Sequence, residues 1–177
     1  APALVFVGAA NGDAATALAR AAQFESAMAA HDVHRPWMHL ARSIVLTHLR
    51  HLAEAESEVD RYEAGLRHVP YAYYGHAVRG MIRLAQQRPR EALAAFAKVL
   101  AINPNYPLAL AGKARALAAL GRPADADRAF AEATRVAPDR PEVWTAWADA
   151  LAAQGNAAAA DAKRVEATRS KERAAKG

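Results

Sequence analysis

The chain has 177 residues, a formal net charge of +5 and no cysteine, and alanine is its most frequent residue. The absence of cysteine excludes disulfides, thiolate metal sites and a cysteine nucleophile. No run of about 18 apolar residues occurs, so the sequence contains no candidate transmembrane helix. Because alanine favours helices and β-branched residues are few, the composition indicates an all-helical fold with the length of one ordinary domain.

The first 36 residues differ from the rest of the chain. They contain a short apolar run at 4–7 and a turn at 11–13, where Asp13 can cap a helix from about 14 to 30. We expect a shortened first helix pair that caps the domain; the alternative is a strand or extended arm through residues 4–7 that docks on a partner. The chain begins Ala-Pro-Ala, as a mature protein does after signal-peptide removal, so a periplasmic location is favoured over a cytoplasmic one.

From residue 36 onward the sequence repeats every 34 residues. Ala92 and Phe96 recur as Ala126 and Phe130, and prolines fall at positions 36, 70, 104 and 138. Within each period, small and apolar residues recur at three- and four-residue steps, which indicates amphipathic helices closed by glycine. The spacing predicts turns at 87–88, 121–122 and 155–156, and helices at 39–52, 55–67, 73–86, 89–101, 107–120, 123–135, 141–154 and 157–171.

The repeated residues resemble the tetratricopeptide repeat family over roughly residues 37–170. The resemblance implies an all-α, right-handed superhelical solenoid of about four to five antiparallel helix pairs, because one pair alone cannot bury its apolar face. It implies one solenoid domain made of a degenerate first unit at 1–36, repeats at 37–72, 73–106, 107–140 and 141–160, and a basic capping helix and tail at 161–177.

Four sets of positions carry the resemblance. They are the small residues of the first helix (Gly80, Ala114 and Ala148), the alanines of the second helix (Ala92, Ala126 and Ala160), the aromatic residues four positions later (Tyr62, Phe96 and Phe130) and the helix-ending prolines (Pro36, Pro70, Pro104 and Pro138). Some residues depart from the pattern: Leu46 and Glu58 stand where small residues are expected, and Arg164 replaces the aromatic residue in the last unit.

The sequence contains no motif for catalysis. Neither a GxSxG element nor a phosphate-binding glycine loop is present, so we expect no enzyme and no cofactor. Histidines cluster at 31, 34 and 39, and His48 and His51 are about one helical turn apart, but no comparable metal-ligand set such as HExxH occurs, and a metal site is not expected. Basic residues are interleaved with acidic ones, so nucleic acid is not the expected partner. A metal- or nucleic-acid-binding accessory protein stays open as an alternative.

The family resemblance implies that the first helix of each pair lines a concave groove for a partner segment. The groove is expected to be apolar in its middle. The lysine and asparagine with which family members hold the C-terminal carboxylate of a chaperone are absent, and Leu108 and Gly112 occupy two of those points. The expected partner-binding residues are Leu40, Ile44, Arg50, His51, Tyr74, Val78, Met81, Leu108, Arg115 and Asp149.

We therefore expect a non-catalytic scaffold, adaptor or assembly subunit of a larger bacterial complex, which binds a protein or peptide segment and no small-molecule substrate. The alternative is a periplasmic maturation factor that holds an unfolded client, since residues 142–152 are similar to the tetratricopeptide domains of cytochrome c maturation systems. A third possibility is a scaffold that assembles end to end. This would need exposed apolar ends, and the charged C-terminal helix argues against it. The chain's own residues 1–12 are another expected occupant of the groove.

Overall fold

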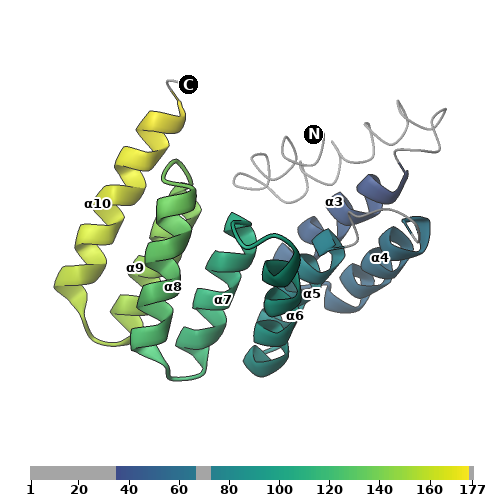
Figure 1. The fold of residues 1–177 in the computed structure, drawn as a ribbon, viewed down its shortest axis with the longest axis horizontal. Coiled ribbons are helices and arrows are strands. Elements are labelled where there is room, and N and C mark those ends of the chain that lie inside the picture. Colours follow the sequence, from purple (N-terminus) through teal and green to yellow (C-terminus); the bar gives the residue numbers. More distant parts are fainter. Residues whose placement is uncertain (1–34, 67–72, 176–177) are drawn as a thin grey trace. The chain divides into compact units, whose positions relative to one another are not determined.

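A computed structural model describes residues 35–66 and 73–175. These residues form eight α-helices and contain no strand (Figure 1). In chain order the helices are α3 (Arg35–His48), α4 (Leu52–Gly65), α5 (Tyr73–Ala85), α6 (Pro89–Ile102), α7 (Pro107–Ala119), α8 (Pro123–Val136), α9 (Pro141–Ala153) and α10 (Ala157–Ala174). The all-helical fold expected from the sequence is confirmed. The expected N-terminal cap or arm, and its place in the groove, lie outside the described residues.

The chain divides into two compact units, which meet in sequence between Arg88 and Pro89. In the first unit, α3 packs against α4 and α5, and α4 also packs against α5. In the second unit, α6 packs against α7, α7 against α8, and α9 against α7, α8 and α10. Because α10 is one continuous helix, the boundary expected between residues 160 and 161 falls inside a helix.

Left-handed backbone marks the turns inside the helix pairs. Gln87 (φ 61°), Gly121 (φ 69°) and Gly155 (φ 79°) follow one another at the 34-residue interval. A glycine adopts this conformation without steric cost, which explains two of the three turn residues. The turns predicted at 87–88, 121–122 and 155–156 are therefore confirmed. Proline, which lacks an N–H and so suits a first helical turn, begins the helices at Pro89, Pro107, Pro123 and Pro141.

The first described helix pair is out of step with this interval. Its left-handed residue is Arg50 (φ 66°), which precedes Gln87 by 37 residues. The shift arises between α4 and α5, whose connection is three residues longer than those from α6 to α7 and from α8 to α9. As a result α3 ends at His48, so the prediction of a helix at 39–52 was wrong. Pro36, expected to end a helix, instead lies in the first turn of α3.

The longer interval removes the apparent misfits of the first pair. Its packing positions are held by Ser43, Ala55 and Val59, which precede Gly80, Ala92 and Phe96 by 37 residues, and all of these residues are buried. Leu46 and Glu58 therefore do not occupy small-residue positions. Tyr62 is not the aromatic residue of the repeat either, although its ring is fully buried and meets Trp37 edge-on at 5.7 Å between ring centroids.

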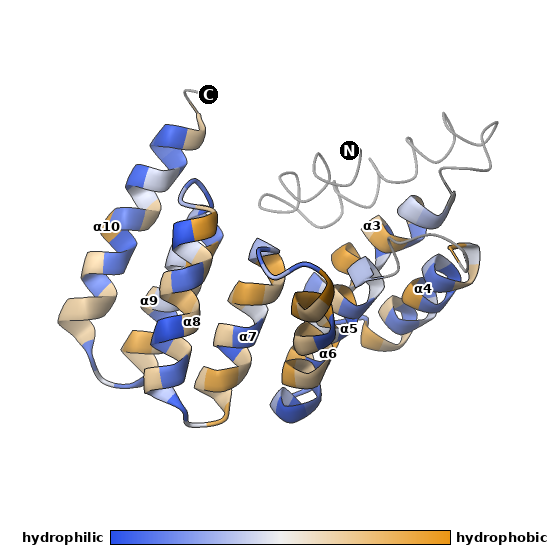
Figure 2. Cartoon of the chain, viewed as in Figure 1, coloured by the Kyte–Doolittle hydropathy of each residue, from blue (hydrophilic) through white to orange (hydrophobic). Residues whose placement is uncertain are grey.

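Aromatic rings and small residues form the core of the second unit. Phe96 and Phe130 are fully buried, and Phe130 stacks on Trp147 with 5.9 Å between ring centroids. The Nε1 group of Trp147 donates a hydrogen bond to Oδ1 of Asp127 at 2.8 Å, so one ring joins α8 to α9 by both packing and polar contact. Figure 2 shows that α10, at the C-terminal end of this unit, carries mainly blue and pale residues, as a solvated terminal helix requires.

Candidate functional site

Most of the expected groove residues of the first unit are part of its core. Leu40, Ile44 and Val78 are 3%, 8% and 1% exposed. Tyr74 and Met81 are half-buried and pack against the same cluster. Leu40, Ile44 and Val78 therefore belong to the apolar core of the first unit, in one cluster with Val59 and Tyr62 of α4. This differs from the apolar groove expected from the sequence.

Arg50 and His51 lie in the turn between α3 and α4 and not on the face of α3. Arg50 holds the left-handed conformation of that turn, and His51 precedes the first residue of α4. Both are exposed, and Nδ1 of His51 lies 3.0 Å from Oε1 of Glu54. The displacement follows from the 37-residue interval, which ends α3 earlier than the 34-residue period predicts. The expected shared face of His48 and His51 on one helix is likewise absent.

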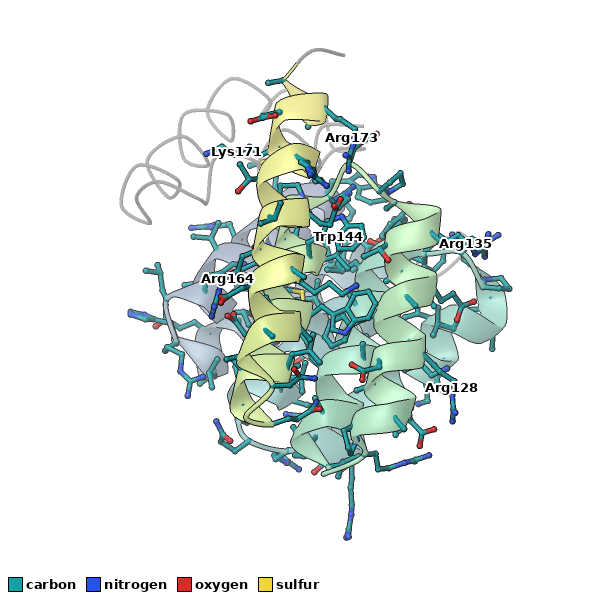
Figure 3. All side chains as sticks on the ribbon, turned by 90° about the vertical axis from the view of Figure 1, so that its left-hand side faces the viewer. Arg128, Arg135, Trp144, Arg164, Lys171 and Arg173 are labelled. Atoms are coloured by element: carbon teal, nitrogen blue, oxygen red, sulfur yellow. The ribbon has the colours of Figure 1, made fainter. Side chains whose placement is uncertain are left out.

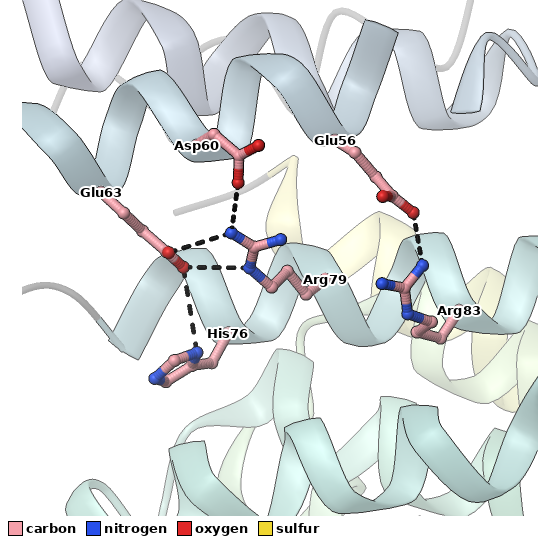
Figure 4. Close-up of polar contacts among 6 residues, drawn as sticks. All are labelled: Glu56, Asp60, Glu63, His76, Arg79 and Arg83. Atoms are coloured by element: carbon pink, nitrogen blue, oxygen red, sulfur yellow. Dashed lines mark hydrogen bonds and ion pairs between the residues drawn. The ribbon is translucent and has the colours of Figure 1, made fainter. Parts of the chain in front are cut away.

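Opposite charges join α4 to α5 in the first unit. The carboxylates of Glu56, Asp60 and Glu63 on α4 face His76, Arg79 and Arg83 on α5 (Figure 4). Arg79 donates to Oδ1 of Asp60 at 2.6 Å and to both carboxylate oxygens of Glu63 at 3.0 and 3.2 Å. The hydrogen bonds to Glu63 raise the pKa of Arg79, and those to Asp60 add to the effect. The charged groups of α4 and α5 thus pair with one another, and little of their charge is left to bind a ligand.

The exposed face of α7 and α9 in the second unit holds the remaining expected residues. Leu108 is half-buried, whereas Arg115 on α7 and Asp149 on α9 are exposed. The surrounding protein withdraws water from Arg115 and lowers its pKa, an effect that the negative charge of Asp149 opposes. Arg115 is nonetheless charged at neutral pH, since arginine is not deprotonated in proteins. Gly112, also expected on this face, is buried against Phe96.

Basic residues also gather on α8 and α10. Figure 3 shows Arg128 and Arg135 of α8 and Arg164, Lys171 and Arg173 of α10 around Trp144. Three of these arginines have acidic partners: Arg128 contacts Asp125, Arg164 contacts Asp161 at 2.7 Å, and Arg173 contacts Asp139 at 3.0 Å. Nearby, the Lys163 ammonium lies 3.7 Å from the ring centroid of Trp147. Much of this positive charge is balanced locally, which is typical of a solvated end.

Two other kinds of site receive no support from the described ranges. Residues 35–66 and 73–175 contain no group of three or more histidine, aspartate or glutamate side chains that could hold a metal ion. Among the helices of the same ranges, none combines the length and apolar character needed to cross a bilayer.

Residues 83–150 match the model of the tetratricopeptide repeat family. The matched segment contains α6 to α8 and most of α9, and with them the paired positions Ala92 and Ala126 and the aromatic positions Phe96 and Phe130. Over these residues the chain is similar to the tetratricopeptide repeat family. No curated protein matches its sequence.

Solved tetratricopeptide repeat structures share the fold. A thermophilic member from Thermus thermophilus is 20% identical with a TM-score of 0.76, and the similarity covers 97% of this chain and 90% of that one. MamA is 15% identical with a TM-score of 0.57, covering 94% of each chain. YrrB, a tetratricopeptide repeat protein with an unusual peptide-binding site, is 16% identical with a TM-score of 0.55, covering 94% of this chain and 85% of its own. At these identities the similarity shows the all-helical tetratricopeptide fold.

The sequence reasoning missed the opposite charges that join α4 to α5. Its signal is present: acidic residues at 56, 60 and 63 and basic residues at 76, 79 and 83 each fall on one helical face. The sequence reasoning used a 34-residue interval for the first repeat, and so it did not place the charged faces of α4 and α5 opposite each other.

Proposed function

We propose that the protein is a non-catalytic scaffold that binds a segment of a protein partner on the exposed face of α7 and α9, as an adaptor or assembly subunit of a larger bacterial complex. One observation carries the proposal: α7 and α9 have the same residue at a buried packing position but different residues at the exposed position next to it. Ala114 and Ala148 are both fully buried, whereas the residues that follow them, Arg115 and Asp149, are exposed and carry opposite charges. A constant core beneath a varied surface is what repeat proteins use for recognition.

A structural neighbour supports a peptide as the bound segment. YrrB is a tetratricopeptide repeat protein with a peptide-binding site, and its fold resembles that of this chain. The residues that would hold a peptide here are nevertheless specific to this chain. Thr145 and Asp149 are both exposed on α9 and are separated by one helical turn, so they share the face that Arg115 borders from α7.

Retention of an unfolded client is less well supported. An unfolded chain exposes apolar segments and needs an apolar surface to hold them. Within the described ranges the large apolar side chains that are well exposed are Ile102, at the end of α6, and Val165, on α10, which do not share a helix. The face of α7 and α9 is polar instead. The periplasmic location expected from the sequence stays a prediction.

The proposal is tested by blocking this face with one bulky side chain. Thr145 and Thr168 are both exposed, and each donates its hydroxyl hydrogen to the carbonyl oxygen four residues earlier, at 3.0 and 3.2 Å. Thr145→Trp on α9 and Thr168→Trp on α10 are therefore matched variants. When the tagged full chain is affinity-purified from its native host, the amount of its specific partner that co-purifies should fall by about tenfold or more with Thr145→Trp and stay unchanged with Thr168→Trp. Equal recovery of the partner with both variants would contradict binding at α7 and α9.

A further inference from the structure

Two opposite charges occupy equivalent positions on α7 and α9. Arg115 and Asp149 are 34 residues apart, and each follows a fully buried alanine, Ala114 or Ala148. Both side chains are exposed, and their helices pack against each other. Because α7 and α9 pack against each other, the negative charge of Asp149 also acts on Arg115 and tends to raise its pKa. The repeat thus places a cation and an anion side by side on one surface.

Neither charge has a counter-ion in contact. No hydrogen bond or ion pair among residues 35–66 and 73–175 involves Arg115 or Asp149. Among the described residues of the second unit, six arginines contact a carboxylate of that unit, whereas Arg90, Arg115 and Arg135 do not; the six are Arg122, Arg128, Arg140, Arg164, Arg169 and Arg173. Arg115 is also partly desolvated by the protein around it. A desolvated guanidinium without a hydrogen-bonded partner gains from an incoming carboxylate more than a fully hydrated one does.

We propose that Arg115 and Asp149 bind one acidic and one basic side chain of the same extended peptide segment. The inference rests on the proposed function and names the chemistry of its partner. Packed helices lie about 8–10 Å apart, and side chains two residues apart on one side of an extended chain are separated by about 7 Å. An extended segment that crosses α7 and α9 can therefore present a carboxylate to Arg115 and an ammonium or guanidinium to Asp149.

The neighbouring residues leave room for the main chain of such a segment. One turn beyond each charge lies an alanine, the half-buried Ala118 on α7 and the exposed Ala152 on α9. Alanine side chains are short, so a peptide backbone can approach the helices between the two charges.

The charge pattern argues against ligands of a single sign. Asp149, which has no contacting cation among the described residues, repels the phosphates of a nucleic acid or an anionic lipid headgroup. Arg115 in turn repels a purely basic segment. A like-charge contact of this kind costs binding free energy and so selects against the wrong partner. A segment with both signs satisfies the two groups together.

The test is the selection of peptides from a displayed library of random decapeptides on the immobilised full chain. The wild-type protein should select peptides that carry an acidic and a basic residue near each other. Arg115→Asp leaves two anions on the face, so its selected peptides should become basic. Asp149→Arg leaves two cations, so its peptides should become acidic. A synthetic peptide chosen by the wild type should bind each variant roughly tenfold more weakly.

Matched controls separate this effect from net charge. Arg169→Asp and Asp161→Arg change the protein's charge by the same amounts at exposed positions of α10, and they should select the same peptides as the wild type. Because all four positions are exposed, unchanged thermal unfolding should show that each variant is folded. If the peptides selected by all five proteins are alike, or if the controls shift them equally, the charge-pair inference is wrong while the scaffold proposal still stands on the Thr145→Trp result. If the wild type selects no peptide, the charge-pair inference is wrong, and the scaffold proposal is decided by the Thr145→Trp result.

Discussion

Gly112 has no side chain, and this allows α7 to lie close to Phe96 of α6. A Cβ atom built at this position would lie 2.2 Å from Cζ and 2.4 Å from Cε1 of Phe96, whose side chain is fully buried. The ring is enclosed by the core, so it has little freedom to move aside. The sequence led us to expect Gly112 on a binding face, yet its role is to admit the ring of Phe96.

Gly112→Ala should destabilise the protein by about 1–3 kcal/mol, the usual cost of overpacking a core. The better helix propensity of alanine, which is about 1 kcal/mol, opposes this cost and does not cancel a contact of 2.2 Å. Urea unfolding of the wild type and the variant measures the difference. The double variant Gly112→Ala/Phe96→Leu should recover part of the loss, because leucine leaves space for the new methyl group. A Gly112→Ala protein more stable than the wild type would show that the ring can move aside.

The pair of helices α4 and α5 is joined by charge as well as by apolar packing. Burial by itself would raise the pKa of Glu56, but hydrogen bonds from Gln86 and Arg83, with the charges of Arg83 and Arg79, outweigh it and lower the pKa below the ordinary value of 4.5. A carboxylate with a lowered pKa stabilises the folded state above the pKa of the unfolded chain. Its contribution is lost as the pH falls below about 4.5 and through the folded-state pKa.

Glu56→Gln should therefore cost up to about 1 kcal/mol of stability at pH 7 and less at pH 3, because the contribution of the Glu56 carboxylate decreases as the pH falls below 4.5 toward its lowered pKa. The cost is small because the Glu56 side chain is partly exposed to solvent. Chemical denaturation at the two pH values measures it. Glu172→Gln, an exposed position on α10, should show no difference at either pH. A cost for Glu56→Gln of equal size at pH 3 and pH 7 would mean that packing, and not charge, is responsible.

At the scale of helices, the sequence predicted most of the second unit and less of the first. From residue 73 onward the expected helices end within three residues of the observed ones, because each repeat places an alanine at the same packing point and two of them place a phenylalanine four residues later. The first pair was misplaced because three more residues separate α4 from α5 than separate α6 from α7, and a strict 34-residue period does not allow for them. The groove could not be predicted from spacing alone, since the burial of Leu40 and Val78 depends on which helices pack over them.

For the whole molecule, the division at Arg88 and Pro89 has a consequence for unfolding. Repeat proteins are stabilised by contacts between neighbouring helices, so the loss of one contact first loosens the region around it. Phe130 and Tyr62 are fully buried aromatic residues in the second and first units. They offer a matched pair of sites for testing whether the two units lose structure separately.

Phe130→Ala should cost roughly 3–5 kcal/mol, as for other buried aromatic residues, and should reduce hydrogen-exchange protection in α7–α10 before α3–α5. Tyr62→Ala should give the reverse order, with protection lost first in α3–α5. Native-state hydrogen exchange resolved along the chain measures both. Uniform loss of protection across the chain in either variant would contradict separate units.

The 34-residue interval between Gly121 and Gly155 has a consequence for how the chain can lengthen by gene duplication. A duplication of residues 121–154 would insert one further α8 and α9, and the new junction would bring α9 against a second α8. The new junction would resemble the existing one between α7 and α8, because Ala148 of α9 holds the fully buried position that Ala114 holds in α7. A duplication of the same length that began at Arg50 would leave the copy three residues out of phase with α5. The second half of the chain can therefore grow by tandem duplication in steps of 34 residues, whereas its first half cannot.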